Sequence, residues 1–342
     1  MSVDPVERIL RELVRDYQAL NPALVAELTA VPSALDFARF TSANRPLILR
    51  RAGQTEQIPA LERWTDEYLV GRLAEGALSI SVTPEGNADA IVDGVFAEPA
   101  TVDMPLEALL AKLREDEQTR AGPVHYLQSQ NGNLGEEYAI LQEDVGTDGP
   151  AFAREVFGDP PEVANIWIGG SRSKTSLHKD PYENIYMVVR GSKTFTLLAP
   201  TEAYCLHEQL FPHATYSFSA ETSSFCLNRT SPPTSLPWIP VDPLAPDLER
   251  FPRYAFARPT KVTLNPGDML YLPALWYHFV EQDVGWGPEG EGKGVKAAIA
   301  VNWWYEMRHD GLLWSTCSLI RRLVLALDGR QEEDLLNSDD EE

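Results

Sequence analysis

One strand-like run follows another between residues 164 and 305, and this pattern constrains the fold more than any other feature of the chain. The runs are rich in β-branched and aromatic residues and are separated by Pro and Gly, as is typical of β-strands. So many short strands in one stretch predict a closed barrel or a jelly roll. The clearest runs are ANIWIG (164–169), ENIYMVV (183–189), KTFTLLA (193–199), TKVTL (260–264), DMLYLP (268–273) and VKAAIAVNWWY (295–305).

Helical patterns flank this region on both sides. Apolar residues in 4–40 recur at spacings of three and four, with Asp4 placed to cap a helix and Pro5 at its first position. LLWSTCSLIRRLVLAL (312–327) is too apolar to be a lone surface helix. The expected fold class is therefore mainly β, with helical additions at both ends.

The remaining segments complete a division of the chain into four parts. Residues 57–120 mix short strands, such as ALSISV (77–82), with helical stretches, such as PLEALLAKLRED (105–116). PLILR (46–50) and VHYLQSQ (124–130) are further strand candidates, and GEEYAILQEDV (135–145) has a helical pattern. The Pro-rich segment 228–259 predicts a long ordered loop, and 283–294 a flexible excursion between strands. The predicted parts are a helical and mixed region packing on the barrel (1–120), a barrel core (121–306), a C-terminal helix (307–330) and a disordered acidic tail (331–342).

The charge of the chain argues against direct nucleic-acid binding. The 342 residues carry a net charge of −22, and the last twelve residues contain seven acids and no base. Affinity for nucleic acid comes from Lys and Arg at phosphates, which such a surface does not favour. The charge would steer a basic partner towards the protein, or it could serve solubility alone.

Cellular location is predicted from three simpler features. No run of eighteen apolar residues exists, so no membrane span is expected. The N-terminus lacks the basic and apolar regions of a secretory signal. The three cysteines are widely spaced and form no CxxC, which indicates a reducing compartment. We therefore expect a protein of the cytoplasm, and also of the nucleus.

TSLHKDPYENIY (175–186) contains the first two candidate metal ligands. Residues two apart on a strand share a face, so His178 and Asp180 can offer an imidazole and a carboxylate to one ion. A third ligand would complete the two-histidine, one-carboxylate arrangement that leaves open positions on iron. An HxD alone is weak, because a polar pair at a strand end has the same pattern.

His278 is the candidate for the third ligand. It lies in NPGDMLYLPALWYHFV (265–280), where a turn leads into a strand and Trp276 shares a face with the histidine. The sequence separation from Asp180 is no obstacle, because distant strands become neighbours in a barrel. The alternative is a core histidine packed beside aromatic residues.

Lys193 raises a similar question of orientation. Residues 184–198 resemble a hairpin with a two-residue turn at Arg190 and Gly191. In one register Lys193 shares the interior face with Tyr186, where an unpaired ammonium is costly and an anionic ligand would compensate it. A register slip of one residue would place Lys193 in solvent instead.

A length estimate requires the chain to bend within this segment. Fifteen residues in one straight strand, from His178 to Lys193, would span about 50 Å. No small molecule bridges that distance, so the chain must turn near residues 180–183 and again near 190–191. Pro181 is consistent with the first bend, because proline interrupts a strand ladder.

These residues, in this order, resemble the jumonji-C family of iron(II)- and 2-oxoglutarate-dependent oxygenases. The motifs are the HxD at 178–180, the lysine at Lys193, PGDMLYLPALWYH ending at His278, and AVNWWY at 300–305. The resemblance is strong over residues 160–306 and looser before them. It implies a double-stranded β-helix, a cupin-like jelly roll, as the core of the fold.

The resemblance also implies a role for each matching residue. Iron(II) would be bound by His178, Asp180 and His278. The distal carboxylate of 2-oxoglutarate would pair with Lys193, helped by Thr175 and Tyr126, and dioxygen would be the other cosubstrate. Asn184 and Asn302 would line the cosubstrate pocket. Tyr186 and Trp304 would form its walls, unless they are plain core aromatics.

Within the family, TSLHKDPYEN, PWIPVDPLAPDLERFP (237–252) and LYLPALWYH resemble the small protein hydroxylases. This implies lysyl hydroxylation of a translation-associated GTPase with a basic target segment, and a homodimer formed through the flanking helices. The helices could instead only cover the barrel. The alternative functions are a demethylase, a hydroxylase of another residue or of RNA, and a non-catalytic cupin-like binding protein.

Overall fold

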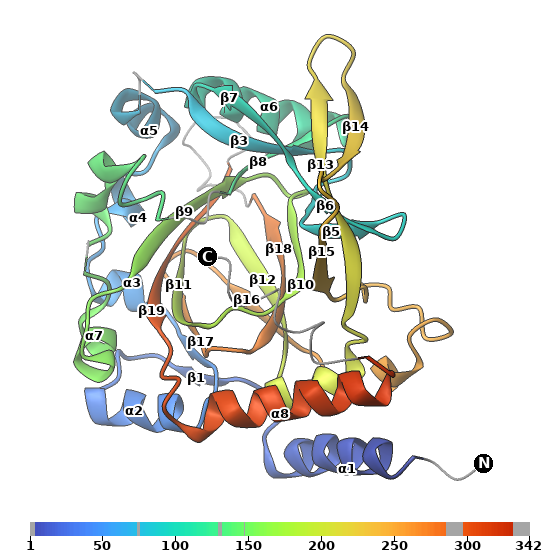
Figure 1. Cartoon of the computed structure of the whole chain (residues 1–342). Coiled ribbons are helices and arrows are strands. Elements are labelled where there is room, and N and C mark those ends of the chain that lie inside the picture. Colours follow the sequence, from blue (N-terminus) through green and yellow to red (C-terminus); the bar gives the residue numbers. More distant parts are fainter. Residues whose placement is uncertain (1–3, 74–75, 129–131, 147, 285–296, 331–342) are drawn as a thin grey trace.

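The computed structural model describes residues 4–73, 76–128, 132–146, 148–284 and 297–330. Two four-stranded antiparallel layers face each other and enclose the interior of the molecule (Figure 1). The first layer consists of β17 (Met269–Leu272), β11 (Tyr182–Arg190), β19 (Ala298–Glu306) and β9 (Val163–Gly169); the second of β16 (Thr260–Leu264), β12 (Ser192–Leu198), β18 (Tyr277–Asp283) and β10 (Lys174–His178). This is the predicted cupin-like jelly roll.

Strand β11 shows how the sequence builds two hydrophobic cores at once. Ile185 and Met187 point outwards into a cluster that the flanking helices cover. Tyr186 and Val188 point inwards, into the core between the two layers. Both faces are buried, which explains the nearly continuous apolar sequence of this strand.

Additional strands and helices enclose the first layer. It grows to nine strands through β1 (Ala26–Leu28), β2 (Leu47–Leu49), β8 (Val124–Gln128), β3 (Leu78–Thr83) and β7 (Ala100–Met104). Between β2 and β9 in the sequence lie the helices α3 (Ala52–Thr55), α4 (Ala60–Arg63), α5 (Asp66–Arg72), α6 (Leu106–Thr119) and α7 (Ala151–Phe157). Turns of 3-10 helix occur at Ala139–Asp144, Pro200–Cys205 and Pro252–Phe256. Figure 1 shows α3, α4 and α7 along the outer side of this layer.

The terminal helices lie side by side at one end of the barrel (Figure 1). Helix α1 (Pro5–Leu20) begins as predicted, because the Asp4 carboxylate accepts the backbone N–H groups of Val6 and Glu7. The predicted helix over 4–40 is wrong beyond Leu20: strand β1 interrupts it before α2 (Ala34–Ser42) begins. Helix α8 (Leu312–Leu327) packs against α1 and the 3-10 turn Pro200–Cys205. Among the described residues, we find no helix with the length and apolarity needed to cross a bilayer.

A third, smaller sheet projects beside the second layer and is called the side sheet below (Figure 1). It contains β5 (Ala90–Val92), β6 (Val95–Glu98), β13 (Gln209–Ser219), β14 (Ser224–Arg229) and β15 (Ser235–Trp238). The short strand β4 (Asn87–Ala88) joins it to the second layer by pairing with β10. The Pro-rich segment 228–259, predicted as a loop, thus includes strand β15 and a 3-10 turn.

The predicted hairpin over residues 184–198 is wrong. Strands β11 and β12 belong to opposite layers, and the chain crosses between them at Gly191. That glycine has φ +67°, and a Cβ there would lie 2.4 Å from the Asp283 carbonyl oxygen, so only glycine suits the crossing. Most of the predicted excursion at 283–294, and the acidic tail at 331–342, lie outside the described residues.

Candidate active site

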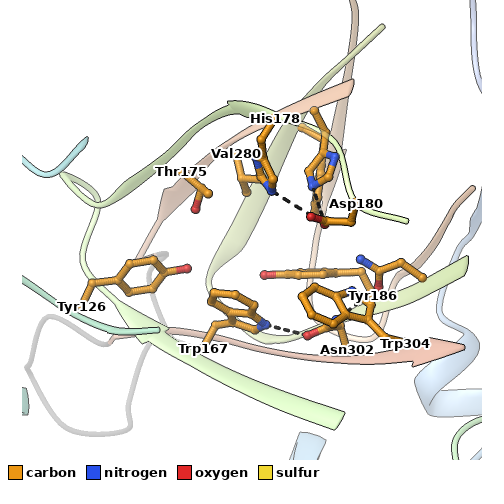
Figure 2. Close-up of a pocket in the computed structure, with 12 residues that line it drawn as sticks. Tyr126, Trp167, Thr175, His178, Asp180, Tyr186, Val280, Asn302 and Trp304 are labelled. Carbon is orange, nitrogen blue, oxygen red and sulfur yellow. Dashed lines mark hydrogen bonds and ion pairs between the residues drawn. The ribbon is translucent and has the colours of Figure 1, made fainter. Parts of the chain in front are cut away.

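The three predicted metal ligands lie together at one end of the barrel interior (Figure 2). His178, at the end of β10, lies directly opposite His278 on β18. Asp180 follows β10 in the turn that leads to the other layer. Its Oδ2 atom lies 3.7 Å from Nε2 of His178 and 3.5 Å from Nε2 of His278.

Backbone hydrogen bonds fix which nitrogen of each imidazole faces the centre. Nδ1 of His178 lies 2.7 Å from the Ser176 carbonyl oxygen, and Nδ1 of His278 lies 3.0 Å from that of Trp276. A carbonyl can only accept, so each Nδ1 carries the proton and each Nε2 has a free lone pair. Burial, and the neighbouring His178, lower the pKa of His278 to about 4, so its ring is neutral and able to ligate a metal at neutral pH.

Lys193 points into the protein, which is one of the two orientations that the sequence allowed. Its side chain is 1% exposed. The ammonium donates hydrogen bonds to the Tyr126 hydroxyl, at 3.2 Å, and to the side-chain oxygen of Gln282. No carboxylate of the described residues forms an ion pair with it, and burial lowers the pKa of Lys193 to about 7. An anionic ligand would therefore be strongly favoured at this position.

A second polar network connects three neighbouring strands of the first layer, β9, β19 and β11. The Trp167 indole N–H donates to Oδ1 of Asn302 at 2.7 Å, and the Asn302 amide donates to Oδ1 of Asn184 at 3.4 Å. All three side chains point inwards from the first layer. The hydrogen bonds hold the two amides in fixed orientations, so they can position a bound polar molecule.

These groups surround a cavity of about 410 Å³, part of which is open to solvent. Every predicted site residue except Lys193 lines it, and the ammonium of Lys193 contacts Tyr126 at its edge. The lining is Tyr126, Trp167, Thr175, His178, Asp180, Asn184, Tyr186, Phe195, His278, Val280, Asn302 and Trp304 (Figure 2).

Besides the apolar wall residues Phe195 and Val280, three residues of the site were not predicted. Trp167 faces inwards on β9 between Ile166 and Ile168, which face outwards, so its alternation was a usable signal. Gln282 lies opposite Lys193 on β18, a pairing that becomes visible only with the register known. Trp238, in the Pro-rich segment, had no periodic signal at all. Its ring lies parallel to the His178 imidazole, with 6.2 Å between centroids.

The arrangement fits an iron(II) ion and a dicarboxylate cosubstrate. Two imidazole nitrogens and one carboxylate oxygen, all within 4.8 Å of one another, are the donor set of non-haem iron oxygenases. Three protein ligands leave coordination positions for other molecules. The buried ammonium of Lys193 supplies the complementary charge for a carboxylate in the same interior.

The fold and the site define a JmjC-type oxygenase, and comparison of sequences shows the same class. The cupin-like domain family matches residues 32–311. The chain therefore belongs to the cupin-like JmjC family, whose members are typically 2-oxoglutarate-dependent oxygenases.

Particular relatives match almost the whole chain. The human bifunctional peptidase and (3S)-lysyl hydroxylase JMJD7 is 38% identical over 95% of this chain and 98% of its own length. The lysine-specific demethylase JMJ32 of Arabidopsis thaliana is 36% identical over 91% of each chain. The JmjC domain-containing protein E of Dictyostelium discoideum is 30% identical over 90% of this chain and 91% of its own length.

Proposed function

We propose that the protein is an iron(II)- and 2-oxoglutarate-dependent hydroxylase that acts on a lysine side chain of another protein. The observation that carries the proposal is the buried Lys193, which has no carboxylate partner among the described residues, in the interior that also holds the three converging ligands. Similarity to the human lysyl hydroxylase supports lysine as the target.

Each group of the site has a part in this reaction. His178, Asp180 and His278 would hold the iron, and Lys193 with Tyr126 would bind the distal carboxylate of 2-oxoglutarate. The bound iron and cosubstrate supply the oxidising chemistry. In the overall reaction dioxygen would provide one oxygen atom to the new C–OH group and one to succinate, and 2-oxoglutarate would lose carbon dioxide. The apolar walls, such as Phe195 and Val280, exclude water from the reacting atoms.

We propose a translation-associated GTPase with a basic target segment as the protein substrate. The net charge of −22 would steer such a segment towards the site at low salt. The proposal includes a cytoplasmic, and also nuclear, location. It also includes a homodimer formed through α1 and α8, which expose Ile9, Leu20, Leu312 and Leu319.

Demethylation is the second candidate, because a relative of similar identity is named a lysine-specific demethylase. Hydroxylation of an N-methyl carbon yields an unstable product that releases formaldehyde, so the same site could perform either reaction. The two differ in the mass of the peptide product. Hydroxylation adds one oxygen atom, whereas demethylation removes one methylene unit.

The test is incubation with iron(II), ascorbate, 2-oxoglutarate and peptides from basic segments of GTPases, in unmodified and methylated forms. We expect succinate release together with an added oxygen on lysine of the unmodified peptide. His178→Ala is the control and should release succinate only at background. Metal binding without any succinate, with every peptide, would favour a non-catalytic binding protein and reject the proposal.

A further inference from the structure

A carboxylate for which the described residues provide no partner lies beside the metal site, on the connection between β4 and β5. Strand β4 pairs in parallel with β10, with Thr175 opposite Ala88. The next residue, Asp89, is held there because the Ser176 hydroxyl donates to its backbone carbonyl. The backbone carbonyl of Ser176 in turn accepts a hydrogen bond from Nδ1 of His178. Asp89 is thus fixed by the strand that carries a metal ligand.

The charge of Asp89 is not compensated within the described parts of the chain. No hydrogen bond or ion pair of its carboxylate occurs among those residues, although the residue is half-buried. The neighbouring acid, Glu98, is already engaged by His213 at 3.2 Å and Thr215 at 3.0 Å. Burial raises the pKa of Asp89 to about 6, while the nearby His178 opposes that rise. A poorly solvated carboxylate favours a cation as its ligand.

Trp238 supplies an aromatic wall next to the same position. Its indole N–H donates to the Ser176 hydroxyl at 3.1 Å, which links it to the group that also holds Asp89. Phe96 of β6 supports the indole, with 4.6 Å between ring centroids. The ring lies parallel to the His178 imidazole. A lysine side chain combines an apolar stem with a cationic end, which suits an indole and a carboxylate from two residues that are both hydrogen-bonded to the Ser176 hydroxyl.

We propose that Asp89 is the specificity residue that binds the ammonium group of the substrate lysine, with the lysine stem against Trp238. This inference rests on the proposed function, because it assigns the recognition of a lysyl substrate to the side sheet. The proposal assigns this role to Asp89 and not to Glu98, because the Glu98 carboxylate already contacts His213 and Thr215. An uncharged side chain of the same length would lose the contact with Asp89 and keep the contact with Trp238.

Binding measurements with matched peptides test this. The probe is a peptide with one central lysine flanked by arginines, and its match carries norleucine in place of that lysine. Calorimetric titration uses protein loaded with zinc(II), which accepts nitrogen and oxygen ligands and has no redox chemistry. With 2-oxoglutarate present, Asp89→Asn should weaken binding of the lysine peptide about tenfold or more and leave the norleucine peptide unchanged.

The substitution has a matched control on the same side sheet. Asp93→Asn, in the exposed turn between β5 and β6, removes the same charge and should change neither affinity. Asp89 and Asp93 have φ values of +52° and +50°, a conformation that asparagine adopts readily. Both variants should therefore fold like the wild type, which thermal unfolding can verify.

Two results overturn the proposal. One is an Asp89→Asn variant that discriminates lysine from norleucine as strongly as the wild type. The other is a wild type that does not discriminate, or that binds neither peptide. Product analysis of the iron-loaded protein separates this outcome from a failure of the proposed function. If the wild type prefers lysine through Asp89 but forms no hydroxylysine, the recognition stands and the reaction was assigned wrongly.

Discussion

Replacing Lys193 with methionine should stabilise the protein without ligands while it weakens cosubstrate binding. Burial lowers the pKa of this lysine from 10.5 to about 7. Each pKa unit corresponds to about 1.4 kcal/mol, so holding the ammonium in the folded state costs about 4–5 kcal/mol near pH 7. Methionine fills a similar volume without the charge. It leaves the Gln282 oxygen without its donor, which costs about 1–3 kcal/mol.

The expected net gain is about 1–4 kcal/mol, or an increase in Tm of about 1–6 °C for a chain of this size. The pH dependence has a defined sign. The unfolded lysine keeps its proton up to pH 10.5 and the folded one only up to about 7, so wild-type stability rises with pH between these values. The advantage of Lys193→Met is therefore complete below pH 7, shrinks by about 1.4 kcal/mol per pH unit above that, and turns into a disadvantage before pH 10.5, because the cost of the unpaired Gln282 oxygen remains.

The assay is thermal unfolding from pH 6 to 10, with and without 2-oxoglutarate and zinc(II). In the same samples, Lys193→Met should lower the affinity for 2-oxoglutarate by about 100-fold, because a buried charge pair is lost. Lys261→Met is the control: this exposed lysine of β16 lies opposite Thr196 of β12, and its loss should shift Tm by less than about 1 °C. A variant clearly less stable than the wild type at pH 7, with unchanged 2-oxoglutarate affinity, would refute the reasoning.

Three further changes test other parts of the structure. Asp180→Asn should reduce the content of bound iron and abolish succinate release, with little change in Tm; normal activity would remove Asp180 from the ligand set. Trp167→Phe removes the donor to Asn302 and should cost about 1–3 kcal/mol in urea unfolding while raising the KM for 2-oxoglutarate. Asp144→Ala leaves three donors, including the Trp64 indole, without their acceptor and should cost about 3–5 kcal/mol in the same assay; a cost below 1 kcal/mol would contradict that account.

The inward orientation of Lys193 was one of two alternatives that the sequence left open, and it was argued from a hairpin that does not exist. In a hairpin, opposed residues of the two strands point to the same face of one sheet. In the jelly roll, β11 and β12 lie in opposite layers, and Tyr186 and Lys193 both point into the space between them. Both arrangements bury the same residues. Alternation along each strand therefore predicted the buried face correctly, although it could not identify the pairing partners.

The side sheet had no comparable signal. Strand β4 has two residues and β15 has four, one of which is Pro237, so neither is long enough to show alternation. Their positions depend on contacts with β10 and β13, which are distant in sequence. Asp89 and Trp238 lie at the ends of these short strands. Their place beside the metal site follows only from the tertiary structure.

This difference separates two kinds of functional residue. The metal ligands and Lys193 lie on or next to long strands whose ladders and two-sided burial fix every side chain, so their geometry tolerates little change. Asp89 and Trp238 follow or end the short strands β4 and β15, and both are tied to the barrel through the Ser176 hydroxyl on β10. Relatives with 36–38% identity carry the names of a hydroxylase and a demethylase. The proposed roles would permit such a divergence, because the metal site would supply the oxidant and the side-sheet contacts would select the substrate side chain that reaches it.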